Sequence, residues 1–248
     1  MIILKSPQEI AKIRAAGRIV AGAIEELKTR VRPGIKTKEL DRIAEEFIHK
    51  KGGIPAFKGY RGYPNTLCIS VNEEIVHGIP SDRVLEEGDI AGIDLGVLLD
   101  GYYGDAAVTL PAGTISSQAK RLMETTEAAL YKAIDAAVIG NRVSDIAHAI
   151  QSYVEGAGYS VVREFVGHGI GRSLHEDPPV PNFGEPGQGP QLREGMVLAI
   201  EPMVNAGRSD LFVLENGWTA VTKDRSLSAH FEHTVAVTKN GPLILTVL

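Results

Sequence analysis

The stretch that decides the fold is "IDLGVLLDGYYGD", residues 93–105, in which two β-like runs flank the dipeptide Asp100-Gly101. A two-residue Asp-Gly link between such runs is a strong signal for a β-hairpin. If these two residues form the turn, Asp94 and Asp105 become diagonal neighbours on the same face of the paired strands. The stretch therefore predicts two converging carboxylates.

The two faces of this hairpin differ in character. The face opposite the aspartates is expected to be the core side, since it carries Ile93, Leu95, Val97, Leu99, Ala106 and Val108. Diagonal Cβ atoms lie roughly 7 to 8 Å apart, a span that a bound cation can bridge but that leaves two bare anions repelling each other. Gly96 and Ala107 leave room for such a ligand. The alternative is that both aspartates point to solvent from an ordinary hairpin, and this stretch alone leaves that open.

Composition narrows the class of protein. The chain has 248 residues, a net charge of -5 and a single cysteine, Cys68. This length buries a sizeable core without cross-links, and one cysteine excludes both an internal disulfide and a Cys-rich zinc module. The acidic balance argues against nucleic acid as a partner, and no apolar run has the length of a membrane span or the layout of a signal peptide. We expect a cytoplasmic protein.

Helical spacing of apolar residues and capping signals predict four helices. The first starts at Ser6, Pro7 and Glu9, which supply an N-cap, a first-turn proline and a capping-box acid. The others cover about 37–51, a stretch capped by Ser116 or Ser117, and about 144–157. Strand-like runs follow each helix pair at "TLCISV" (66–71), "DIAGIDLGVLLDGYYGDAAVTL" (89–110), "SVVREFV" (160–166), "GMVLAI" (195–200) and "FEHTVAVT" (231–238).

The order of elements repeats along the chain. "GIKTKELDRIAEEFIHKKG" (34–52) and "GNRVSDIAHAIQSYVEGAG" (140–158) align without a gap. Two unrelated amphipathic helices could share such a pattern, because helical periodicity alone forces apolar matches. We favour an internal duplication with pseudo-repeats at about 1–112 and 113–248, packed as one α/β (α+β) domain over residues 1–248.

More metal-ligand types lie outside the hairpin. Glu201 ends the apolar run "GMVLAIE", Glu232 opens "EHTVAVT", and His168 stands between glycines in "VGHG". Each glutamate alone could simply mark the point where a strand meets water. Together with Asp94 and Asp105, however, the set suits two divalent ions that share bridging carboxylates.

Five blocks carry a resemblance to a known family: "VNEEIVHGIP" (71–80), "DLGVLLDGYYGD" (94–105), "VGHGIGRSLHEDPPVPNFG" (166–184), "AIEPMV" (199–204) and "WTAVTKDRSLSAHFEHT" (218–234). In the order and spacing of these blocks, the chain resembles type I methionine aminopeptidases of the short bacterial kind over essentially its whole length. The resemblance implies the pita-bread fold, an internally pseudo-symmetric domain whose central antiparallel sheet carries a dinuclear metal site.

The resemblance also implies roles for individual residues. The metal ligands would be Asp94, Asp105, His168, Glu201 and Glu232, with Asp105 and Glu232 bridging two divalent ions (Co, Mn, Fe or Zn). Asp94 would bind one ion, and His168 and Glu201 the other. Glu201 is also the candidate general base.

Seven further residues are implied as a substrate-binding set. His77 and His175 would hydrogen-bond the scissile amide as non-ligand catalytic residues, although a lone histidine of either kind could equally be structural. A small apolar pocket for the methionine side chain would be lined by Tyr60, Tyr63, Cys68, Leu174 and Trp218. The aromatic residues of "KGYRGYP" (58–64) could instead pack a turn, and Cys68 is expected to be a buried apolar residue with no catalytic thiol.

The implied activity is removal of the N-terminal methionine from nascent proteins and peptides by dinuclear-metal-assisted hydrolysis of the first peptide bond, with a preference for a small second residue. A transient ribosome contact fits such a substrate. We expect a monomer with neither nucleic-acid specificity nor membrane attachment.

Four other interpretations are weaker. Proline-specific peptidases share these ligand types but generally carry a large extra N-terminal domain, and type II enzymes carry an insertion between the last two glutamates, which here are only 31 positions apart. A catalytically dead scaffold should have lost ligands, and none is missing. A sugar or phosphate hydrolase would leave the histidines unexplained and lacks a phosphate-cradling glycine loop.

Overall fold

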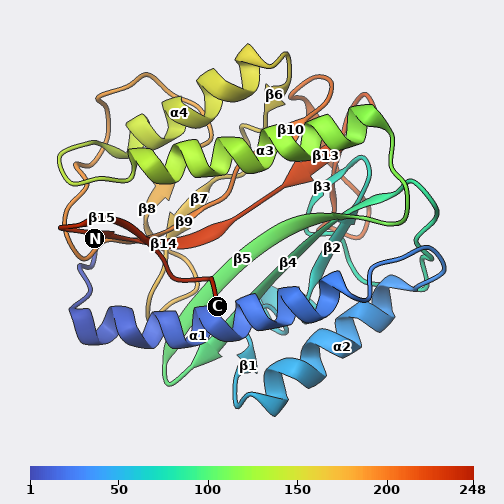
Figure 1. Ribbon diagram of the computed structural model, residues 1–248, viewed down its shortest axis with the longest axis horizontal. Helices are drawn as coiled ribbons and strands as arrows, with labels where there is room; N and C mark the ends of the chain where they lie inside the picture. The colour runs from blue at the N-terminus through green and yellow to red at the C-terminus, as the bar shows by residue number, and fades with distance from the viewer.

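The computed structural model describes residues 1–248, and its helices and strands form two layers (Figure 1). The helices α1 (Pro7–Lys28), α2 (Thr37–Lys50), α3 (Ser117–Ala136) and α4 (Val143–Gly156) lie on the viewer's side of the strands. The pair α1 and α2 covers one half of the sheet layer, and the pair α3 and α4 covers the other. No helix combines the length and apolar composition that crossing a membrane requires.

The strands form four antiparallel sheets. The first contains β1 (Ile54–Pro55), β4 (Ile90–Leu99) and β2 (Cys68–Val71) in that order, with β5 (Tyr102–Pro111) also paired to β4. The largest has the order β15 (Gly241–Ile244), β14 (His233–Thr238), β9 (Val197–Ile200), β7 (Gly167–Gly169) and β8 (Glu176–Val180). Two smaller sheets have the orders β13 (Ser228–His230), β10 (Met203–Asn205), β6 (Ser160–Val161) and β11 (Leu211–Val213), β12 (Ala220–Thr222), β3 (Glu74–Val76).

The hairpin predicted at Asp100-Gly101 is confirmed. Both turn residues have positive φ, 49° at Asp100 and 78° at Gly101, as a two-residue turn between right-twisted strands requires. The register of β4 and β5 pairs Leu99 with Tyr102, Gly96 with Asp105 and Asp94 with Ala107, as predicted. The two aspartates are therefore diagonal neighbours.

The apolar face of this hairpin packs against the helices. Ile93, Leu95 and Val97 of β4 are fully buried in one cluster with Val20 of α1 and Ile48 of α2. Each such side chain contributes about 1.5 to 3 kcal/mol by leaving water. Because successive residues of a strand point to opposite faces, the aspartates lie on the face away from the helices.

The helix predictions hold with small shifts at the ends. Ser6 caps α1 through a complete capping box with Glu9, and Ser116 caps α3. The strand expected at "SVVREFV" is wrong for most of its length, since only Ser160–Val161 pairs, with β10. Residues after Val162 turn away from the sheet, and glycine-flanked β7 occupies the place beside β9.

Several local features support the internal duplication. Helices α2 and α4 have the same length and begin at equivalent positions of the ungapped alignment. The glycines that bound the two aligned segments all have positive φ, 90° and 79° in the first and 99° and 86° in the second. An isolated β-bridge precedes each helix, Lys36 with Val84 and Arg142 with Gln191, again at aligned positions.

The two halves meet along a seam that joins β5 to the segment leading into β14. The amide of Glu232 donates to the carbonyl oxygen of Ala107 at 2.9 Å, and the reciprocal bond measures 3.4 Å. The Thr234 hydroxyl donates to the carbonyl oxygen of Asp105 at 2.7 Å and accepts from the Asp105 amide at 3.1 Å. Two of the predicted ligands therefore sit at the junction itself.

Candidate metal centre

One cavity of about 170 Å³ collects every site residue predicted from the sequence. Its wall includes all five predicted ligands, both predicted non-ligand histidines and the five predicted pocket residues. They come from strands and loops spread over residues 60 to 232 of the chain. The sequence-predicted site residues are thus a spatial cluster, and their individual roles stay predictions.

Two pairs of diagonally neighbouring residues on paired strands supply four of the donors. Asp94 of β4 and Asp105 of β5 form the first pair, because Gly96 stands opposite Asp105. In the other half, His168 of β7 stands opposite Ala199 of β9, so Glu201, two residues further on, is its diagonal neighbour. Glu232, at the seam, is the fifth donor.

The donor atoms converge to distances that a shared cation can bridge. Ligand atoms of Asp105, His168 and Glu232 all lie within 4.8 Å of one another. Nε2 of His168 lies 3.9 Å from Oδ2 of Asp105 and 3.7 Å from Oε1 of Glu201. No protein hydrogen bond links these atoms, so each retains a lone pair for a ligand.

The His168 ring is held in the tautomer that metal binding needs. Its Nδ1 lies 2.9 Å from the carbonyl oxygen of Gly169, an acceptor, so Nδ1 carries the proton and Nε2 offers a lone pair to the cavity. Burial, followed by the nearby His175, lowers the pKa of His168 to about 3, which keeps the imidazole neutral. A neutral imidazole is the form that ligates metal.

The glycines around His168 have a steric purpose. A Cβ at Gly167 would collide with the carbonyl oxygen of Ala199 in β9, and one at Gly169 would collide with the carbonyl oxygen of Asp177 in β8. Strand β7 is therefore squeezed between two backbones at this point. On this strand, Nε2 of His168 lies within 4 Å of carboxylate oxygens of Asp105 and Glu201.

The four carboxyl groups form no ion pair with a lysine or an arginine, and their only basic neighbours are histidines. Burial raises the pKa of Asp94 to about 7 and that of Glu201 to about 8. Burial and the neighbouring carboxylates raise the pKa values of Asp105 and Glu232 well above their ordinary range. One oxygen on each of Asp94, Asp105 and Glu232 is buried without any hydrogen-bond partner.

These features fit divalent metal ions. A buried, unpaired carboxylate is costly unless a cation or proton compensates it, and this cluster holds four around one imidazole. Carboxylate and imidazole donors accept Mn, Fe, Co and Zn alike. The donor set therefore matches the predicted metal site.

His77 projects into the cavity from a strained backbone. Its φ of 60° places it in the left-handed region, which costs a non-glycine residue about 1 to 3 kcal/mol and is typical of functional positions. Its ring packs edge-on against Phe165 and Trp218, with centroids 5.3 and 6.3 Å away. Burial, with nearby His230 and His175, lowers its pKa to about 4, so His77 is neutral at pH 7.

His175 lies at the rim of the cavity, stacked on Tyr60. The ring centroids are 5.2 Å apart, and Nδ1 of His175 is hydrogen-bonded to the Tyr60 hydroxyl at 2.8 Å. The His168 and His175 rings approach to 4.2 Å between centroids. Partial burial and the guanidinium of Arg61 lower the pKa of His175.

The predicted methionine pocket forms one side of the cavity. The Tyr63 hydroxyl lies 2.9 Å from the carbonyl oxygens of both Leu67 and Gly78, which share its single proton, and its ring meets Trp218 edge-on with the ring centroids 5.1 Å apart. Cys68 is free and buried opposite Asp94 in the β2–β4 register, and burial raises its thiol pKa. The expectation of an apolar, non-catalytic cysteine fits this setting.

Three residues near the centre escaped the sequence analysis. Phe57 and Arg61 line the cavity, and His230 is buried with its Nε2 3.6 Å from Oε2 of Glu201. His230 stands two positions before Glu232, a spacing that puts both on one face of a strand and could have drawn attention to it. Arg61 lies between Gly59 and Gly62 in a short turn, where sequence gives no direction for the side chain.

Comparisons with known proteins agree with this geometry. "Methionine aminopeptidase 1" of Bacillus subtilis is 58% identical over 246 residues, which cover 99% of either chain. A crystal structure of a methionine aminopeptidase from Thermotoga maritima superimposes with a TM-score of 0.99 at 48% identity, covering both chains completely. A prolidase from Pyrococcus furiosus shares the fold at a TM-score of 0.81 and 26% identity, but the present chain covers only 66% of it.

A pita-bread fold that gathers four carboxylates and an imidazole in one cavity defines the class of the protein as a metal-dependent peptidase. The sequence profile of Metallopeptidase family M24 matches residues 11–239. The chain belongs to this family, and within it to the short, type I methionine aminopeptidases.

Proposed function

We propose that this enzyme removes the N-terminal methionine of peptides and nascent chains by hydrolysing their first peptide bond with two divalent ions. The observation that carries the proposal is the convergence of five donors on one cavity, with three buried carboxylate oxygens lacking any partner. Asp105 and Glu232 would bridge the ions, Asp94 would bind one, and His168 and Glu201 would bind the other. Bound there, the ions would activate a water molecule and polarise the scissile carbonyl.

Glu201 is the proposed general base. Its carboxylate takes a proton from the attacking water and passes it to the leaving amine nitrogen as the carbon–nitrogen bond breaks. Its carboxylate lies between two imidazoles, with Oε1 3.7 Å from Nε2 of His168 and Oε2 3.6 Å from Nε2 of His230.

His77 and His175 are proposed to hold the reacting amide from two sides. Both are neutral at pH 7, because burial lowers their pKa values, so each ring can offer one N–H and one lone pair. The hydroxyl of Tyr60 fixes the orientation of His175. In the transition state the carbonyl carbon becomes tetrahedral. Hydrogen bonds to the oxygen and the nitrogen attached to this carbon stabilise the transition state more than the substrate.

Methionine selectivity is proposed to arise from Tyr60, Tyr63, Cys68, Leu174 and Trp218. Aromatic rings and a sulfur atom suit an unbranched thioether, whose sulfur makes favourable contacts with ring edges. Tyr63, which is hydrogen-bonded to the backbone, packs against the ring of Trp218, and these contacts limit how far the pocket can widen. A branched or longer first residue would therefore be excluded.

The proposal extends to the setting of the reaction. Nascent chains with a small second residue would be the substrates, in the cytoplasm, and the protein would act as a monomer with at most a transient ribosome contact. The names of the relatives support the methionine specificity, since these relatives match the chain over essentially its full length.

The test compares peptides that differ at one position. Purified protein loaded with Mn(II) should release the first residue from Met-Ala-Ser but not from Leu-Ala-Ser or Met-Leu-Ser, and a chelator should abolish release. Calorimetric titration of the metal-free protein should give two Mn(II) per chain. Release that survives chelation, or a failure to cleave Met-Ala-Ser with any of Mn, Fe, Co and Zn, would refute the proposal.

A further inference from the structure

A second buried imidazole lies beside the proposed base. The side chain of His230 is 4% exposed, and its Nε2 has no hydrogen-bond partner in the protein. That nitrogen lies 3.6 Å from Oε2 of Glu201. A buried polar atom without a partner is costly, and natural proteins rarely keep one without a use.

The two oxygens of Glu201 face different rings. Oε1 lies 3.7 Å from Nε2 of His168, whose Nδ1 proton is committed to the Gly169 carbonyl. Nε2 of His168 therefore offers a lone pair and cannot donate to Glu201. Oε2 faces His230, the only neighbour in this pair that is able to supply a proton.

The backbone of His230 is held in place by two neighbouring segments. Strand β13 pairs His230 with Met203 of β10, directly after the Glu201 segment. The His230 amide donates to the Thr109 hydroxyl at 2.9 Å, and that hydroxyl donates back to the His230 carbonyl at the same distance. His230 is thus clamped between the two halves of the molecule.

We infer that His230 is a positioning residue for Glu201, whose Oε2 it holds with an Nε2–H donor so that Oε1 stays directed at the metal ligands. The inference rests on the proposed metal centre. Closing the present separation by less than 1 Å would give a hydrogen bond of ordinary length, about 2.7 to 2.9 Å for a charged acceptor. Partners of this kind fix the orientation of a ligand and raise its affinity for metal.

The alternative is that His230 only fills space. A filler can be replaced by an apolar side chain of similar size without any effect on metal binding, and removing its unpaired nitrogen would even stabilise the fold. The two interpretations therefore predict opposite outcomes for the same variant.

The decisive variants are His230→Leu, which removes the donor, and His230→Gln, which keeps an N–H at similar reach. Titration calorimetry with Mn(II) on the metal-free proteins should show His230→Leu binding Mn(II) about 10- to 100-fold more weakly, with His230→Gln restoring most of the affinity. After Mn(II) saturation, kcat on Met-Ala-Ser should fall for His230→Leu while KM stays near the wild-type value.

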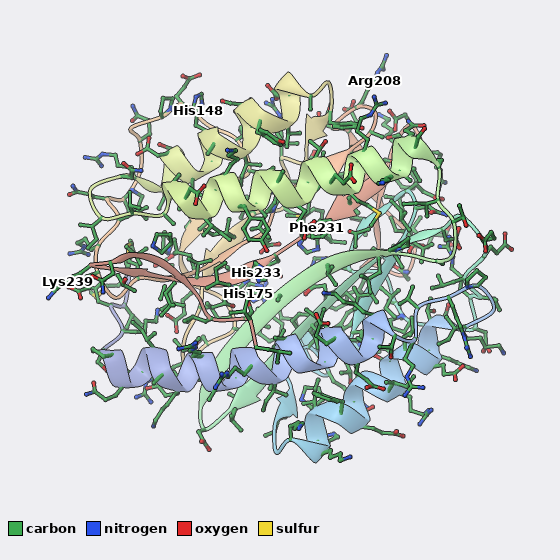
Figure 2. All side chains as sticks on the ribbon, viewed as in Figure 1. His148, His175, Arg208, Phe231, His233 and Lys239 are labelled. Atoms are coloured by element: carbon green, nitrogen blue, oxygen red, sulfur yellow. The ribbon has the colours of Figure 1, made fainter.

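A matched control separates this effect from general damage. His233 is half-buried, its Nδ1 is hydrogen-bonded to the Thr246 hydroxyl, and it lines a different cavity, between α1 and α3, near the centre of Figure 2. His233→Leu should lower the unfolding temperature and leave Mn(II) affinity unchanged. Wild-type Mn(II) affinity and kcat in His230→Leu would overturn the inference, whereas a wild-type protein that binds no Mn(II) would overturn the metal centre itself.

Discussion

Asp105 stands at the most crowded point of the charge cluster, next to Asp94 and Glu201 and beside the seam. Replacement by asparagine keeps the shape and removes one negative charge. With Mn(II), kcat for Asp105→Asn should fall more than about 100-fold, because the loss of a proposed bridging ligand exceeds the usual cost of losing an outer partner. An Asp135→Asn variant, at an exposed position of α3, supplies the charge control.

Metal-free stability should change in the opposite direction. Burial and the neighbouring carboxylates raise the pKa of Asp105 well above its ordinary range, so at pH 7 the metal-free protein folds at the cost of keeping a proton on this group. Asparagine avoids that cost, so the metal-free Asp105→Asn protein should gain about 1 kcal/mol in unfolding free energy, measured by urea titration. A loss of stability without metal, together with wild-type activity, would show that Asp105 is an ordinary buried aspartate.

At the residue scale, a position could be predicted from the sequence where nearby residues alone determine it. Asp94 and Asp105 could be placed on one face because a two-residue turn fixes the register of both strands, and that register is confirmed. His230 and Arg61 could not be identified in the same way. Their direction depends on contacts with distant segments, such as the Thr109 clamp on His230, that no local pattern contains.

At the scale of the elements, the contribution of the N-terminal cap of α1 to stability can be tested by mutation. Glu9 accepts from the Ser6 amide at 3.0 Å and from the Tyr102 hydroxyl at 2.8 Å. The hydrogen bonds from Ser6 and Tyr102, and a weaker one from Arg172, lower the pKa of Glu9 to about 2. The ionised carboxylate therefore ties the start of the helix to the β4–β5 hairpin.

The pH dependence follows from the sign of this shift. A folded-state pKa below the ordinary value of 4.5 means that ionised Glu9 stabilises the protein above pH 4.5 and that this contribution fades as the pH falls toward 2. Glu9→Gln should lower the unfolding free energy of the metal-free protein by roughly 0.5 to 1 kcal/mol at pH 7. The difference from wild type should shrink between pH 4.5 and pH 3.

Glu39→Gln is the matched control for this measurement. Glu39 occupies the same third position of α2 but forms no capping hydrogen bond. Its substitution should have a smaller effect with no comparable fading in acid. Equal effects of the two variants at every pH would mean that the capping box contributes nothing beyond the helix dipole.

Element boundaries were predictable where capping residues mark them, as at Ser6 and Ser116. They were not predictable at "SVVREFV", whose β-branched residues suit a strand. Strand length there depends on which neighbour is available, and β6 pairs with β10 for only two residues. Pairing partners that lie far away in the chain decided the outcome.

For the whole molecule, metal binding should raise stability, because the ligands come from both halves. A ligand at about 100 times its dissociation constant adds about 2.7 kcal/mol to unfolding free energy, which corresponds to roughly 5 to 10 °C for a chain of this size. Differential scanning calorimetry with and without saturating Mn(II) should show this shift in the wild-type protein. Asp105→Asn should show little of it, and an unchanged melting temperature in the wild type would contradict a site that bridges the halves.

The seam between β5 and the segment leading into β14 has a consequence for the folding of the protein. One half supplies Asp94 and Asp105, and the other supplies His168, Glu201 and Glu232, so neither can gather the donors before the two have docked. A partly folded or mispaired chain is therefore chemically silent. The ability to cut peptides therefore depends on the docking of the two halves and not on either half alone.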